Sequence, residues 1–377
     1  MTPKKILLLS VSAGAGHMRA AAAIAAHANG ADANVVAIHL DVMDYVTAAF
    51  RKIYTDFYIK LVNRAPGLWG YLYHASNEAE PDSSMERMRR ALERLNTRAL
   101  LRQIASFAPD AIICTHFLPA EILSRMIRKH GFSCPVWVQV TDFDLHRMWV
   151  HEHMSGYFAA TEEVAFRMRA QGIAAAQIHV TGIPIMPAFG AAPERTLCAR
   201  ELGLDPALPT IVLMGGGAGL GSLDTVAAGL LALDGAFQLI ALAGKNVQTL
   251  AALQALALRY PGRLVPMGFT DQVERLLACA DLVITKPGGL TTSECLAMGL
   301  PMIVNSPIPG QEERNADYLL EQGVALKAFD RVTLEYRVQQ LLAHPERLAA
   351  MRVKARALGR PDAARAVLAT VMRSQQA

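Results

Sequence analysis

The chain has 377 residues, of which 52% are hydrophobic and 19% charged, and its formal net charge is +4. This length is too great for one ordinary core and predicts two domains of roughly 180 residues with a cleft between them. The small, dispersed positive charge argues against a nucleic-acid-binding protein and is compatible with an anionic membrane face.

Cysteines and apolar segments limit the class of protein further. The five cysteines are scattered without a C-x-x-C pair, which indicates neither a disulfide framework nor a zinc site. No secretory signal precedes the first apolar run, and the longest uncharged stretch, 206–223, contains two prolines and five glycines. We therefore expect a cytoplasmic protein without a membrane-spanning helix. Apolar strands alternate with alanine-rich helical patterns, which predicts an α/β fold with parallel sheets.

The first predicted strand, 5–10, runs into a glycine turn and an alanine-rich helix. A dinucleotide fingerprint would need glycine or alanine where Arg19 stands, which argues against a dehydrogenase. Gly14 and Gly16 instead leave room for an acceptor at the carboxyl end of the strand, where open α/β sheets place ligands. His17 can remove a proton from an alcohol there. A histidine that only caps or positions is the alternative.

Aromatic and basic residues interleave from 46 to 77, where Trp69 and Tyr73 lie, and an arginine-rich helical pattern follows at 86–102. Such a segment is typical of a surface that touches anionic lipid. Buried aromatic residues beside a solvated basic helix would explain it as well.

The strand predicted at 136–140 is followed by TDFDLHRMWVH, which includes Asp142, His146 and Trp149. Acids, histidines, a cation and an indole just past the end of a strand indicate a site. A bound metal ion is the rival explanation, but His146 and His151, five residues apart, are a poor pair of metal ligands. We therefore expect no metal and no cofactor, and take Asp142 and His146 as catalytic candidates.

Two prolines in 180–187 mark the end of a first domain, 1–187. A second begins with the strand 210–214 and a glycine series containing Gly216 and Gly217, which fits a phosphate-facing loop but completes no dinucleotide fingerprint. Two further strands end at Lys245 and at Gly268-Phe269.

The stretch 282–315 carries the strongest pattern, a buried strand, a glycine turn and a helix start. The backbone N–H groups of the turn and first helical residues can hold a diphosphate; these residues are Lys286, Gly288, Gly289, Leu290 and Thr291. Glu294 either closes a Thr-x-x-Glu capping box or accepts from ribose hydroxyls. After the strand 302–304, a proline-rich loop delivers Gln311, Glu312 and Asn315, which suit sugar hydroxyls. An ordinary helix N-terminus with polar caps is the alternative.

The KPGG-x-T-x-[ST]E stretch, the PxPGQE-x-x-NA loop and the TDF-x-LH-x-x-WVH run resemble the monogalactosyldiacylglycerol synthases and processive diacylglycerol glucosyltransferases, inverting enzymes of family 28. The resemblance implies the GT-B architecture, two facing Rossmann-like domains, 1–187 for the acceptor and membrane and 188–345 for the UDP-sugar. It also implies that the final segment, 346–377, crosses back to the first domain as a helix. The sequence pattern predicts this helix over 344–373.

By this resemblance the chain transfers glucose or galactose from a UDP-sugar to diacylglycerol, at anionic lipid on the inner face of the cell membrane. His17 would be the base and Gly268 and Phe269 would hold the uracil edge, while the glycine loop 215–222 departs from the expected pattern. An undecaprenyl-linked N-acetylglucosaminyltransferase is the rival enzyme, and an idle UDP-sugar sensor is the rival from another class.

Overall fold

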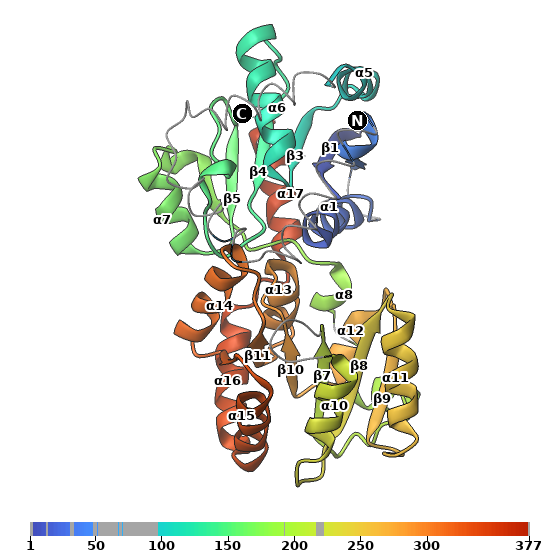
Figure 1. The fold of residues 1–377 in the computed structure, drawn as a ribbon. Coiled ribbons are helices and arrows are strands. Elements are labelled where there is room, and N and C mark those ends of the chain that lie inside the picture. Colours follow the sequence, from blue (N-terminus) through green and yellow to red (C-terminus); the bar gives the residue numbers. More distant parts are fainter. Residues whose placement is uncertain are drawn as a thin grey trace. The chain divides into compact units, whose positions relative to one another are not determined.

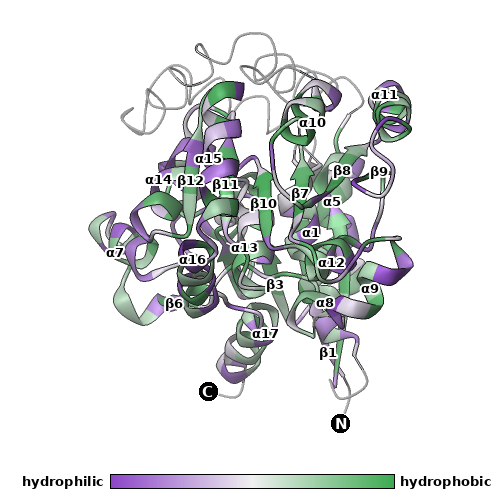
Figure 2. Ribbon diagram, turned by 90° about the horizontal axis from the view of Figure 1, so that it is seen from below, coloured by the Kyte–Doolittle hydropathy of each residue, from purple (hydrophilic) through white to green (hydrophobic). Residues whose placement is uncertain are grey.

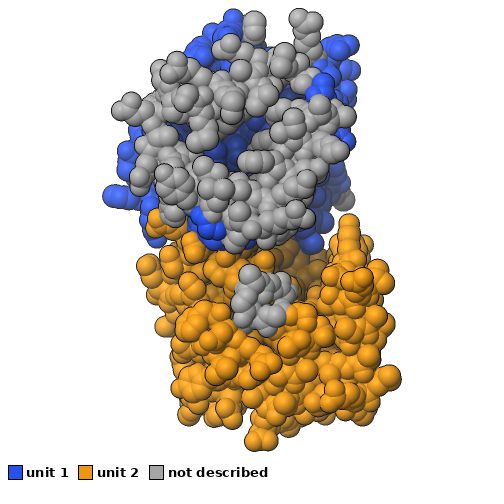
Figure 3. All heavy atoms as spheres, viewed as in Figure 1, with its two compact units in different colours: residues 1–187, 308–311, 361–377 blue, residues 188–307, 312–360 orange. Residues whose placement is uncertain are grey.

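The computed structural model describes residues 3–375 except 13, 31–33, 48–96 (within which 51, 67 and 70 are described), 192 and 216–221. These residues form two compact units, unit 1 (residues 1–187, 308–311 and 361–377) and unit 2 (residues 188–307 and 312–360), coloured separately in Figure 3. Each unit has its own six-stranded parallel sheet flanked by helices (Figure 1), so the predicted α/β class with parallel sheets is confirmed.

Unit 1 is built on a sheet with the strand order β2-β1-β3-β4-β5-β6, in which all neighbours are parallel. Its strands are β1 (Lys4–Ser10), β2 (Val35–Asp41), β3 (Ala111–Cys114), β4 (Val136–Gln139), β5 (Gly156–Ala159) and β6 (Ile178–Val180). Its helices are α1 (Ala15–Ala28), α5 (Thr97–Phe107), α6 (Phe117–His130), α7 (Glu162–Ala170) and α17 (Ala363–Ser374), with 3-10 turns η1 (Val42–Tyr45), η2 (Arg147–Trp149) and η3 (Ala175–Gln177).

The two faces of this sheet follow from the alternation of side chains along each strand. Ile6 and Leu8 of β1 pack in one core with α1 and α17, which contributes Val367, Leu368 and Val371. Leu7 and Leu9, buried as fully, point to the opposite face. The first and last helices described in the chain thus complete one core.

Unit 2 is built on a sheet with the strand order β12-β11-β10-β7-β8-β9, again all parallel. This is the doubly wound order of dinucleotide-binding folds, which reverses between β7 and β10. The strands are β7 (Thr210–Met214), β8 (Gln238–Gly244), β9 (Leu264–Gly268), β10 (Leu282–Thr285), β11 (Met302–Asn305) and β12 (Ala325–Ala328). Figure 2 colours β10, β7 and β8 as hydrophobic, as expected for strands covered on both faces.

The helices of unit 2 are α8 (Pro187–Gly190, which begins at the unit boundary), α9 (Arg195–Glu201), α10 (Leu223–Leu231), α11 (Val247–Ala257), α12 (Val273–Cys279), α13 (Gly289–Ala297), α14 (Gln311–Glu321), α15 (Arg331–Ala343) and α16 (Pro345–Leu358). The prediction of a single helix over 344–373 is wrong. Its first half is α16 and its second half is α17, divided by residues 359–362. Pro361 explains the break, because proline lacks an N–H and its ring disfavours a helical residue before it.

None of the helices in the described parts of the chain is long and apolar enough to cross a bilayer.

Candidate active site

His17 lies where the strand order of the unit 1 sheet reverses, between β1 and β3. It is the third residue of α1, which follows β1, and the segment after the neighbouring β3 begins with Thr115 and His116. Open parallel sheets bind ligands at this edge, because the loops after two adjacent strands diverge there. The sheet therefore brings two histidines together from positions about a hundred residues apart.

Hydrogen bonds on one side of the His17 ring fix its tautomer. Nδ1 lies 2.9 Å from the carbonyl oxygen of Thr115 and 2.8 Å from Oγ1 of Thr141. A carbonyl can only accept, so Nδ1 carries the proton and Nε2 keeps its lone pair. Thr115 also donates its hydroxyl to the His17 carbonyl at 2.9 Å, which secures the first turn of α1. The ring is thus held by Nδ1 and presents Nε2 as a proton acceptor.

The surroundings keep His17 uncharged. Burial lowers its pKa to about 4, against a weaker opposite effect from the Thr115 carbonyl. His116 contacts the His17 ring edge-on at 4.6 Å between centroids, and burial followed by proximity to His17 holds its pKa well below its usual value. Trp149, 4% exposed, completes the ring cluster at 6.0 Å from His17. Trp149 is therefore a buried neighbour of the two histidines, and its part in an acceptor or membrane site stays a prediction.

Gly14 leaves space at the other edge of the His17 ring. A Cβ at this position would lie 3.3 Å from Cδ2 and 3.8 Å from Nε2 of His17. The backbone of Gly14 is extended, with φ 168°, so the conformation itself does not demand glycine. Gly16, the second residue of α1, lies in the same first turn.

The other catalytic candidates follow β4, the next strand along the sheet. His146 is almost fully buried, and its Nδ1 accepts the backbone N–H of Met148 at 3.1 Å, capping η2. Asp142 is partly exposed in the loop just after β4. The carboxylate two residues on, Asp144, is buried and pairs with Arg167 at 3.3 Å. Because it caps η2, the ring of His146 has a structural role.

In unit 2, the predicted diphosphate turn lies at the end of β10, where the strand order of that sheet reverses. Gly288 is the N-cap of α13, and as a glycine it has no side chain that could cap the helix. The N–H groups of Gly289, Leu290 and Thr291 are those of the first helical turn, which has no intrahelical acceptors for them. The arrangement offers oriented donors and a partial positive charge to an anion.

The capping-box explanation of Glu294 is wrong, because α13 begins at Gly289 and Thr291 already lies inside it. Glu294 is 4% exposed, and the Cys295 thiol beside it has a pKa raised first by burial and then by the Glu294 charge. Asn315 is fully buried on α14, and its Nδ2 donates to the Pro287 carbonyl at 3.0 Å, so it braces the turn.

The proline-rich loop places its polar residues in different units. Glu312 Oε1 would lie 3.8 Å from a Cβ at Gly288, so its carboxylate approaches the turn. Gln311, the first residue of α14, is grouped with unit 1, whereas Glu312 and Asn315 belong to unit 2.

Three further donor-site candidates lie at the ends of β8 and β9. Lys245 Nζ lies 4.9 Å from the centre of the Phe269 ring, and Phe269 is 66% exposed. Gly268 ends β9 and already lies against Leu250, since a Cβ there would be 3.3 Å from its Cδ2. Lys286 is partly exposed just after β10. The remaining predicted residues, Gly216, Gly217, Trp69 and Tyr73, lie outside the described residues.

Sequence reasoning missed Thr115, Thr141 and His116, which hold or flank the His17 ring. The signal was weak, because Thr115-His116 and Thr141 come just after β3 and β4, and threonine beside a strand has many ordinary roles. In the described ranges, no group of three or more histidine, cysteine and acidic side chains is placed to hold a metal ion.

Two family models match the chain. The monogalactosyldiacylglycerol (MGDG) synthase model matches residues 17–185, and the model of the glycosyltransferase family 28 C-terminal domain matches residues 210–367. A processive diacylglycerol beta-glucosyltransferase of Bacillus pumilus is 27% identical over 372 residues, covering 98% of this chain and 95% of the relative. The enzyme of that name from Bacillus cereus strain AH187 is 30% identical, covering 70% of this chain and 68% of the relative.

Solved structures share the fold at low sequence identity. MurG of Acinetobacter baumannii has a TM-score of 0.59 and 17% identity, with 98% of this chain and 100% of that chain covered. HepE of Anabaena, in complex with UDP and glucose, has a TM-score of 0.55 and 15% identity, with 98% and 100% covered. These likenesses show the fold alone, two Rossmann-like domains of the GT-B type.

Proposed function

This chain belongs to the glycosyltransferase family of the processive diacylglycerol beta-glucosyltransferases and monogalactosyldiacylglycerol synthases, and from that membership we propose that it transfers a hexose from a UDP-sugar to diacylglycerol. The observation that carries the proposal is His17, whose Nδ1 is held by Thr115 and Thr141 while Nε2 is left as a base. The free hydroxyl of diacylglycerol is the group whose proton such a base removes.

In the proposed reaction, Nε2 of His17 takes the proton of the acceptor hydroxyl as its oxygen attacks the anomeric carbon of the sugar. The bond from that carbon to the diphosphate oxygen breaks, and UDP leaves with the electron pair. Attack opposite the leaving group inverts the anomeric configuration. A neutral His17 suits this step, because its lowered pKa leaves the ring unprotonated before the attack.

The donor is held by unit 2 in this proposal. The first-turn N–H groups of α13 bind the diphosphate and stabilise the charge that develops on it as the bond breaks. Glu294 accepts from the ribose hydroxyls, and Gln311 and Glu312 contact the sugar. The support for these assignments is the uncapped start of α13 at the reversal point of the sheet.

The acceptor requires the protein to work at a membrane surface. Diacylglycerol remains in the bilayer and exposes only its glycerol hydroxyl, so we assign the protein to the inner face of the cell membrane with anionic lipid as its partner. The net charge of +4 supports attraction to such a surface.

A thin-layer assay tests the function directly. The full chain is incubated with vesicles containing diacylglycerol and with radiolabelled UDP-glucose or UDP-galactose, and the lipid products are separated. Labelled glycolipid from either donor supports the proposal and identifies the sugar. Transfer only from UDP-N-acetylglucosamine to an undecaprenyl acceptor, or UDP-sugar binding with no transfer to any lipid, would contradict it.

A further inference from the structure

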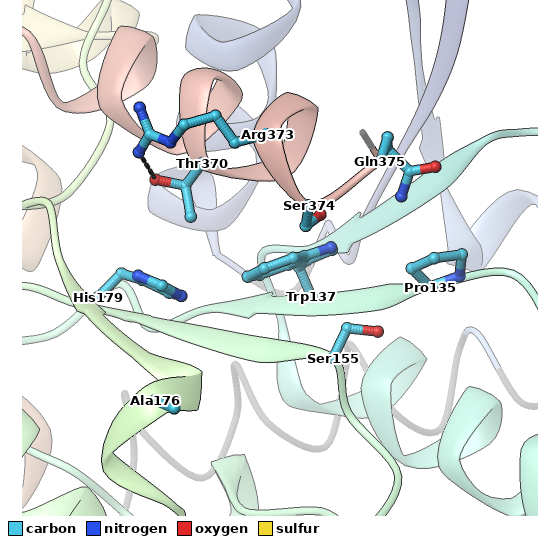
Figure 4. A pocket seen from close by; sticks show the side chains of 9 residues that line it. All are labelled: Pro135, Trp137, Ser155, Ala176, His179, Thr370, Arg373, Ser374 and Gln375. Atoms are coloured by element: carbon cyan, nitrogen blue, oxygen red, sulfur yellow. Dashed lines mark hydrogen bonds between the residues drawn. The ribbon is translucent and has the colours of Figure 1, made fainter. Parts of the chain in front are cut away.

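A hollow lies in unit 1 at the amino ends of β4, β5 and β6, whereas His17 lies at the carboxyl end of β1. It has a volume of about 480 Å³. Its lining residues come from these strand ends and from the last turn of α17 (Figure 4). An adjoining hollow of about 590 Å³ shares His179, Thr370 and Arg373 with it. Volumes of this size are those of small-molecule sites.

The floor of the hollow is the indole of Trp137, which is rigidly held. The ring lies against the backbone of Gly156, where a Cβ would approach Cε3 at 2.8 Å, and stacks on Phe158 at 5.3 Å between centroids. In Figure 4 its nitrogen end is turned toward Pro135 and Gln375. Trp137 is 4% exposed, and its Nε1–H has no hydrogen-bond acceptor among the described residues. A buried N–H without an acceptor is destabilising, and a ligand oxygen that reached it would recover that cost.

Arg373 and Ser155, beside the indole, can donate hydrogen bonds to a ligand. Arg373 donates one N–H to Thr370 at 3.2 Å and keeps four for other acceptors. The Ser155 hydroxyl accepts the Val136 N–H at 3.1 Å and retains its own proton. The nine residues that line this hollow in the described part of the chain include no carboxylate. Burial, and then the charge of Arg373, lower the pKa of His179, so His179 adds no charge of its own.

We propose that this hollow is a binding site for a small phosphate ester, with one anionic oxygen on Trp137 Nε1–H and the others on Arg373 and Ser155. A phosphate group matches several convergent donors and one guanidinium, which a neutral ligand would leave unpaired. The ester could be soluble or could be the headgroup of a phospholipid, because the recognised chemistry is the same. The site is independent of the transferase proposal.

The test uses the chain's three tryptophans as reporters. In full-length protein labelled with 15N-tryptophan, Trp137→Phe assigns the Trp137 indole N–H resonance. Titration of the unsubstituted protein with glycerol 3-phosphate should shift that resonance saturably in the millimolar range or below while the Trp149 resonance stays in place. Arg373→Gln should weaken binding at least tenfold. Arg365→Gln is the matched control, because Arg365 lies on the same helix but pairs with Asp362 outside the hollow.

Two further arms separate the sources of the phosphate. A shift with glycerol 3-phosphate assigns the site to soluble esters, and a shift only with phosphatidylglycerol vesicles, not phosphatidylcholine vesicles, assigns it to a headgroup. No shift in either arm, or an equal shift in the Arg373→Gln variant, would overturn the proposal. Calorimetry on Trp137→Phe, which keeps an aromatic side chain but loses the N–H together with the five-membered ring, should show binding weakened several-fold.

Discussion

His17 is held by one ring nitrogen and offers the other, so its removal should affect chemistry more than substrate binding. We predict that His17→Ala lowers kcat by about 10²–10⁴-fold, the usual contribution of a general base. UDP affinity should be nearly unchanged, because the residues proposed to hold the diphosphate and ribose belong to unit 2. Steady-state kinetics and calorimetry with UDP measure the two effects. A loss of less than tenfold would make His17 a positioning residue and transfer the role of base to Asp142 or His146.

The low pKa of His17 predicts an unusual pH dependence. Because burial lowers this pKa to about 4, the ring remains a base down to that value, whereas an ordinary histidine would be protonated near pH 6.5. The acid limb of kcat/KM that belongs to His17 should therefore lie near pH 4. Between pH 6.5 and 4 the unfolded chain binds a proton that the folded chain does not, so stability falls as the pH falls. A His17-dependent limb near pH 6.5 would show that the ring is solvated.

A substitution of Gly14 tests whether the acceptor occupies the space beside His17. We expect Gly14→Ala to reduce kcat/KM for the acceptor, because the new Cβ would lie 3.8 Å from Nε2. Stability should change by less than about 1 kcal/mol, since the backbone is extended and only the His17 ring, 3.3 Å from the new Cβ, must shift slightly. Unchanged kinetics in a normally folded variant would place the acceptor elsewhere.

Glu294 is buried in the second turn of α13, beside the proposed diphosphate turn, and a ribose contact there is testable. Glu294→Gln should raise KM for the UDP-sugar more than it lowers the melting temperature. Ser293→Ala is the matched control, because its hydroxyl donates to the Gly289 carbonyl at 2.8 Å and its loss should reduce stability alone. Equal donor KM values in the two variants would contradict a ribose contact.

At the scale of elements, the sequence predicted the central strands and missed three of the four edge strands. β1, β3, β4, β7 and β10 are continuous apolar runs because both faces are covered, and a run of that kind is visible in the sequence. β2, β6 and β12 went unrecognised. All three lie at an edge of their sheet and are only partly buried, so polar residues interrupt their patterns.

α17 was predicted as the second half of one helix that crosses back to the first domain, and the structure shows it as a separate helix. Its apolar face completes the core of unit 1, so Leu368→Ala should destabilise that unit by about 2–5 kcal/mol. Urea unfolding followed by circular dichroism measures this loss. Arg365→Ala on the exposed face of the same helix should leave the midpoint nearly unchanged. Equal midpoints for both variants would mean that α17 adds nothing to the core.

At the scale of the whole molecule, the two strand–glycine–helix patterns at the ends of β1 and β10 predicted the two candidate sites. Their placement was not predictable. Each lies where the strand order of its sheet reverses, and that order depends on pairings such as β7 with β10, between segments about seventy residues apart. The hydrogen bonds that His17 Nδ1 makes to Thr115 and Thr141 depend on the same long-range pairings.

The membership of α17 in unit 1 has a consequence for synthesis on the ribosome. Residues 1–187 emerge first, but their core needs Val367, Leu368 and Val371. At roughly 5–20 residues per second, about 10–40 s of elongation separate these two parts of one core. Unit 2, encoded between them, can finish folding while unit 1 still exposes the face of its sheet that α17 covers. During that interval the nascent chain is open to chaperones, and a message truncated before codon 363 would leave that face uncovered permanently.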